Sequence, residues 1–104
     1  MGAGALVDKC AFHTQRQQEM QKVRTHVYCT IRRICDMKVE HKVEPVVATE
    51  RELREHFEEK HWKMLANWVE YGVVTKTRGI RYDLYKINYG EYERYEKELR
   101  NRLQ

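Results

Sequence analysis

Two pairs of metal-binding residue types lie near the start of the chain, Cys10-x-x-His13 and His26-x-x-Cys29, with twelve residues between them. Thiolate and imidazole are ligands that zinc prefers, and the spacing overlaps that of zinc fingers. The intervening residues, however, read as continuous helix, which would hold the two pairs roughly 20 Å apart within one chain. We therefore expect ordinary structural or surface side chains here, with no metal site and no cofactor.

No set of side chains in the sequence assembles into a catalytic mechanism. Nucleophilic catalysis needs a serine or cysteine beside a histidine that a third group orients, and the chain has no serine and no glycine-rich phosphate loop. Cys35 adjoins an apolar helical stripe and is expected to be a small core residue. We expect no enzymatic activity and no small-molecule ligand.

The clearest charge cluster lies at residues 72–88. It sets Lys76, Arg78, Arg81 and Lys86 against Asp83 alone, a balance of +3 in a chain of net charge +4. The β-branched and aromatic runs on both sides of Arg78-Gly79 predict a β-hairpin over 73–87, with Gly79 supplying the positive φ of a tight turn. Basic hairpin tips can serve only to keep an edge strand soluble, but such clustering favours contact with phosphate.

A long first helix is predicted over residues 8–35. Its apolar positions recur at steps of three and four, the period of one helical face, and they are Met20, Val23, Val27, Ile31 and Ile34. Residues 36–48 break this pattern and contain Pro45, the only proline. They are expected to form a loop with one short strand.

Residues 49–71 are helical by their apolar spacing. Thr49-Glu50-Arg51-Glu52 has the form of a capping box, so a helix should begin at 49 or 50, and Gly72 stands where a left-handed C-terminal cap is wanted. No Gly, Pro, Ser or Asn lies between Leu53 and Trp62 to make a turn. Both one continuous helix and two helices joined by a turn remain open.

The last predicted helix spans residues 90–103. One face carries an apolar stripe formed by Tyr92, Tyr95, Leu99 and Leu103. Because this stripe has no assigned partner in a minimal core, we predict that it forms the interface of a homodimer. The long first helix is the other candidate interface.

Size and composition indicate one intracellular domain over residues 1–104. Its 41% hydrophobic and 35% charged residues are typical of a polar globular protein. We find no apolar run long enough for a membrane span and no signal peptide. Three cysteines, an odd number, favour reduced thiols in the cytoplasm or nucleus. The expected fold class is α+β and mostly helical.

The order of these elements resembles the winged helix-turn-helix superfamily of DNA-binding proteins. The resemblance covers roughly residues 30–88, and its most specific part is Tyr71-Gly72-Val73-Val74 running into the basic hairpin. It implies a helix-turn-helix plus wing over 49–88, in which the helix near 59–71 enters the DNA major groove and the hairpin touches the flanking backbone or minor groove. By this resemblance the DNA-facing helix residues are Lys60, Lys63 and Asn67.

We therefore expect double-stranded DNA as the partner, bound through those three residues and through Lys76, Arg78 and Arg81, as in a small transcriptional regulator or replication accessory factor. The alternative is a winged-helix-like protein-interaction module within a larger complex. Glu55, Glu58 and Glu59 place negative charge at the start of the groove-entering helix, where carboxylates also stabilise the helix itself.

Overall fold

The computed structural model describes the backbone of residues 2–103 and the side chains of residues 16–102. The elements, in chain order, are α1 (Gly2–Glu40), β1 (Ala48–Thr49), α2 (Glu50–Arg54), α3 (Glu59–Tyr71), β2 (Val74–Arg78), β3 (Asp83–Ile87) and α4 (Tyr89–Leu103). The strands form one antiparallel sheet in the order β1-β3-β2. The predicted α+β, mostly helical class is confirmed. No helix of the described backbone is long and apolar enough to cross a membrane.

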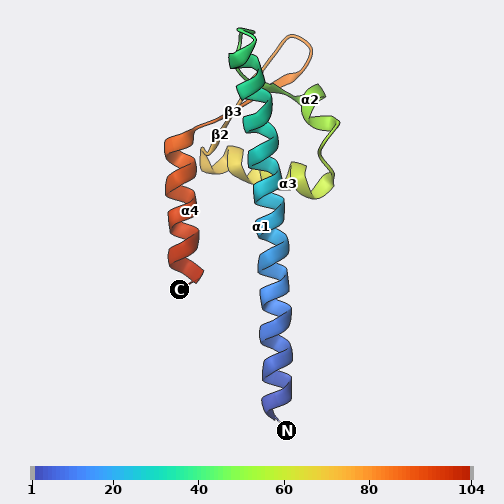
Figure 1. The fold of residues 1–104 in the computed structure, drawn as a ribbon, viewed down its shortest axis with the longest axis vertical. Helices are drawn as coiled ribbons and strands as arrows, with labels where there is room; N and C mark the ends of the chain where they lie inside the picture. The colour runs from blue at the N-terminus through green and yellow to red at the C-terminus, as the bar shows by residue number, and fades with distance from the viewer. Residues whose placement is uncertain (1, 104) are drawn as a thin grey trace.

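Helix α1 extends beyond the predicted range at both ends and is the long axis of the molecule (Figure 1). No Gly or Pro interrupts residues 5–40, and the helix ends where Lys42 takes a left-handed φ of 54°. Its stripe from Val23 to Ile34 is buried as predicted. Met20, predicted on the same stripe, is 45% exposed because α1 leaves the core near Val23.

Residues 50–71 form two helices, so the continuous-helix alternative is wrong. Thr49 and Glu52 make the predicted capping box: the Thr49 side chain accepts from the Glu52 N–H at 3.2 Å, and Glu52 Oε1 accepts from the Thr49 N–H at 3.0 Å. Helix α2 ends at Arg54, and α3 begins at Glu59. Phe57 is buried within the turn between them. The turn thus forms without any of the usual turn residues.

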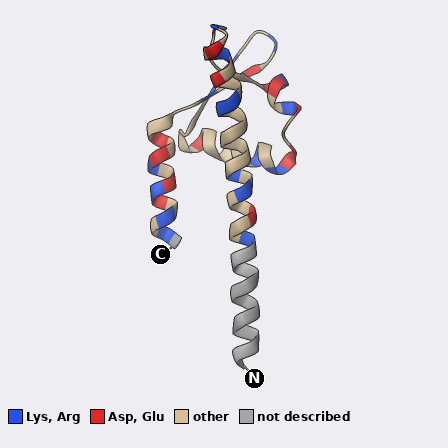
Figure 2. Cartoon of the chain, viewed as in Figure 1, with Lys and Arg blue, Asp and Glu red and all other residues tan. Residues whose placement is uncertain are grey.

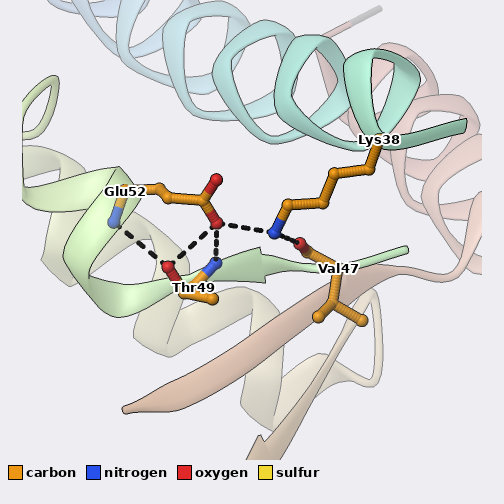
Figure 3. A network of polar contacts seen from close by, with 4 residues as sticks. All are labelled: Lys38, Val47, Thr49 and Glu52. Atoms are coloured by element: carbon orange, nitrogen blue, oxygen red, sulfur yellow. Dashed lines mark hydrogen bonds and ion pairs between the residues drawn. The ribbon is translucent and has the colours of Figure 1, made fainter. Parts of the chain in front are cut away.

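A polar network fixes β1 and α2 against the end of α1 (Figure 3). Lys38 Nζ donates to Val47 O at 2.6 Å and lies 2.7 Å from Glu52 Oε1, the atom that also serves the capping box. Burial alone would raise the pKa of Glu52, but the hydrogen bonds from Lys38 and Thr49 outweigh it and lower that pKa below its ordinary value.

The hairpin forms as predicted, with β2 and β3 paired from Val74↔Ile87 to Arg78↔Asp83. The prediction of positive φ at Gly79 is wrong, because Lys42 and Gly72 are the positive-φ residues of the described backbone. Glycine is needed at 79 for space: a Cβ there would lie 2.4 Å from Tyr82 O, which accepts the Gly79 N–H at 3.1 Å. Gly72 does form the predicted left-handed cap, at φ 81°.

The core lies where α1, α3 and the sheet meet, and Trp68 is fully buried in it. Helix α4 packs onto this core through aromatic contacts. The Tyr92 ring stacks on Tyr28 at a centroid distance of 4.2 Å, and Tyr92 and Tyr95 approach Trp68 edge-on at 5.6 and 6.1 Å. Such pairs contribute about 0.5–1.5 kcal/mol beyond burial.

Candidate nucleic-acid interface

The hairpin presents its basic residues to solvent. Strand β2 is one of the two edge strands of the sheet, and every side chain from Thr75 to Arg78 is exposed. Lys76 pairs with Asp83 at 3.6 Å. Arg78 and Arg81 are exposed, and neither has an ion-pair partner among the described side chains. Figure 2 shows this basic loop at the end of the molecule away from the N-terminus. These two arginines are therefore free to meet an external anion.

Helix α3 presents the three other predicted residues on its outward face. Lys60, Lys63 and Asn67 are all exposed, opposite the buried side of the helix that carries Leu65 and Trp68. Both lysines already have carboxylate neighbours, with Lys60 3.4 Å from Glu58 and Lys63 3.5 Å from Glu59. Since both pairs are solvent-exposed, they are weak and can be exchanged for other anions.

The charge of the two parts differs in sign. Residues 50–71 hold four basic and six acidic residues, a balance of −2, whereas residues 72–88 carry +3. Long-range attraction of a polyanion therefore comes from the hairpin and not from the α2–α3 segment. The helix offers hydrogen-bonding groups at short range, chiefly the Asn67 amide, which suits base edges better than phosphates.

Asn88, which the sequence analysis did not single out, fixes the hairpin to the end of α3. Its Nδ2 donates to Gly72 O at 2.8 Å and to Thr75 Oγ1 at 2.9 Å, and its backbone N–H donates to Val73 O at 2.8 Å. Asn88 thus joins the end of α3 to the beginning and the end of the hairpin. A lone Asn between a strand and a helix gives no sequence signal for this role.

His61 is a second residue whose role the sequence did not reveal. Its side chain is 7% exposed, and Nδ1 accepts the backbone N–H of Glu58 at 2.9 Å, which caps the start of α3. The ring lies against His26, with centroids 4.3 Å apart, and His26 Nε2 contacts His56 O at 2.8 Å. Burial, then His26 and Lys60, lower the pKa of His61. Two histidine side chains thus contact the backbone of the α2–α3 turn.

The predicted dimer stripe has partners within its own chain. Tyr92 and Tyr95 are half-buried against Trp68 and Tyr28, so the unpartnered face that motivated the interface does not exist at these two positions. Leu99 is half-buried beside α1, and the Leu103 side chain lies outside the described residues. A homodimer stays a prediction.

The described side chains do not bring together the four Cys and His residues considered as zinc ligands. Cys10 and His13 lie outside the described side chains, whereas Cys29 is exposed and His26 is engaged with the α2–α3 turn. Among described residues no group of three or more His, Cys, Asp or Glu is arranged to hold a metal ion.

The fold and the exposed charges define a small α+β domain with a basic hairpin beside a short-turn helix pair. Comparisons with protein-family models, with curated proteins and with solved structures give no match.

Proposed function

We propose that this chain is a winged helix-turn-helix domain that binds double-stranded DNA. Helix α3 would lie against the major groove, and the β2–β3 hairpin would be the wing that contacts the flanking backbone. The observation that carries the proposal is that Arg78 and Arg81, at the tip of a hairpin that directly follows α3, have no ion-pair partner in the described part of the chain.

The arrangement of the elements supports this proposal. A short helix and a second helix joined by the four-residue turn 55–58 precede a hairpin, in a sheet ordered β1-β3-β2. Asn88 joins the hairpin to the end of α3, so one packed unit offers both a helix face and a charged loop. DNA-binding modules of this size commonly combine groove contacts with phosphate contacts in this way.

Salt dependence and charge removal test the proposal together. Duplex affinity of the full chain, measured by fluorescence anisotropy, should fall steeply between about 50 and 200 mM salt, because each phosphate contact adds roughly 0.9 to the logarithmic slope. Arg78→Ala with Arg81→Ala should lower the slope by about 2. The control Arg94→Ala with Arg102→Ala removes the same charge from exposed positions on α4 and should leave the slope unchanged. Absence of duplex binding at low salt would reject the proposal.

One observation favours a second function, a protein-interaction module. The outward lysines of α3 have carboxylate neighbours, and the hairpin tip carries Ile80 fully exposed at 104%. Ile80 lines a recess together with Val43 and Leu84, and a contiguous apolar surface of this kind suits a partner protein. In that case Ile80→Ser would abolish partner binding, and the chain would show no salt-dependent affinity for duplex.

A further inference from the structure

A concavity of about 700 Å³ lies in the corner between α1 and the beginning of α3. The α1 wall contributes Arg16, Lys22 and His26, and the α3 wall contributes Lys60 and His61. Glu19 is the carboxylate among the described lining residues. Three cationic side chains and two imidazoles from two helices therefore surround one recess, although they are far apart in the sequence.

His61 supplies a hydrogen-bond donor to this recess. Because its Nδ1 accepts the Glu58 N–H at 2.9 Å, the neutral ring carries its proton on Nε2. His61 is 7% exposed and lines the concavity, and its Nε2 has no hydrogen-bond partner among the described residues. Among the described residues Trp68 Nε1 is the one fully buried side-chain polar atom without a partner, so solvent reaches the His61 Nε2–H, and an anion in the recess that His61 lines could accept from it.

The surrounding charges favour an anion as the acceptor. Arg16 and Lys22 are exposed and have no ion-pair partner in the described part of the chain. Lys60 has Glu58 at 3.4 Å, but these side chains are 61% and 73% exposed, so the pair is weak. The positive end of the α3 dipole lies at the same corner and adds to the attraction.

We propose that this corner is a phosphate-binding site, in which the Nε2–H of His61 and the ammonium groups of Lys22 and Lys60 hold one phosphate group. The identity of the molecule that supplies this phosphate rests on the proposed function. Lys60 belongs both to this corner and to the outward face of α3, so the ligand is a backbone phosphate of a DNA duplex bound on α3. Helix α1 then becomes a third DNA-contacting element beside α3 and the hairpin.

Inorganic phosphate is the first probe, with the full chain at pH 7.5 and sodium chloride as the control at equal ionic strength. The ring ¹⁵N resonance of His61 Nε2 should shift saturably with phosphate and not with chloride. Lys22→Met should weaken phosphate binding roughly three- to tenfold, by loss of a charged hydrogen bond. Glu19→Gln should strengthen binding, an outcome that simple damage to the fold cannot produce. Equal shifts with phosphate and chloride would overturn the site.

Duplex DNA is the second probe and separates this site from the proposed function. Lys22→Met should reduce the salt slope of duplex affinity by about 0.9, while Glu19→Gln should raise affinity. If the duplex binds but Lys22→Met changes neither slope nor affinity, the corner is not a contact and only this inference fails. If phosphate saturates the corner but no duplex binds, the phosphate site stands, and the duplex as its source is rejected together with the proposed function.

Discussion

The hydrogen bond from the Glu58 N–H to His61 Nδ1 offers the sharpest test of the α2–α3 turn. His61→Phe keeps a planar ring in the core and removes this acceptor. A buried donor left without a partner costs about 1–3 kcal/mol. Because this hydrogen bond is only partly buried, we expect the lower part of that range, about 1–2 kcal/mol, at pH 7.5. For a domain of this size each kcal/mol corresponds to roughly 4–8 °C in Tm.

The same hydrogen bond predicts a pH dependence with a definite sign. Burial, His26 and Lys60 lower the pKa of His61 in the fold, so the folded chain binds fewer protons at this group than the unfolded chain. Its contribution to stability is therefore complete above the unfolded pKa of about 6.5 and is lost as pH falls toward the folded pKa. Protonation also places a second N–H where the Glu58 N–H points.

Urea unfolding followed by tryptophan fluorescence at pH 7.5, 6.5 and 5.5 measures this effect. The wild-type free energy of unfolding should fall over this range, and His61→Phe should be less stable at pH 7.5 and less sensitive to pH. The exposed His41 provides the control, since His41→Gln should match the wild type. An unchanged pH profile in His61→Phe would refute the role of His61 as a cap. The pKa of Glu52 is also lowered, so its effect on the pH dependence of stability falls below the pH range of this experiment.

Three further substitutions test other parts of the fold. Gly79→Ala should lower the free energy of unfolding by about 1–2 kcal/mol, because its Cβ would lie 2.4 Å from Tyr82 O. The control Gly90→Ala has open space in helix α4 and should raise the free energy of unfolding by about 0.5–1 kcal/mol. Equal effects of the two substitutions in urea unfolding would contradict the close approach at Gly79. Lys38→Met should cost about 1 kcal/mol through the loss of its bonds to Val47 and Glu52, and the exposed Lys42→Met should be neutral by the same measurement. Tyr92→Ala should release α4 from Tyr28 and Trp68. Limited proteolysis would detect this release as early cleavage within residues 89–103. Cleavage no faster than in the control Tyr89→Ala would argue against aromatic docking of α4.

Local signals allowed much of the secondary structure to be predicted. The capping box at Thr49 and the glycine cap at Gly72 use contacts within a few residues of one another, so the sequence defines them directly. Local signals do not predict the α2–α3 turn, which only the resemblance implied, because the buried ring of Phe57 and the cap supplied by His61 take the place of a Gly, Pro or Asn. The sequence does not reveal which role Gly79 has, because a close steric approach and a positive φ favour the same residue type.

Only the part of the candidate interface that depends on local sequence could be predicted. The charge cluster that contains Arg78 and Arg81 is visible in the sequence, and the hairpin places it in solvent. The pairing of Lys60 and Lys63 with carboxylates depends on side-chain placement, which spacing alone does not determine. The meeting of His26 with His61 joins residues from α1 and α3, and only the tertiary fold brings them together.

Amide chemical-shift mapping during titration with a short duplex at low salt tests the central claim most directly. We predict that the perturbed amides cluster on the hairpin over 75–82, on α3 over 60–67 and around Lys22 on α1, and that those of α4 remain unaffected. Perturbations confined to α4, or none at a duplex concentration above that of the protein, would contradict the assignment of this domain to DNA binding.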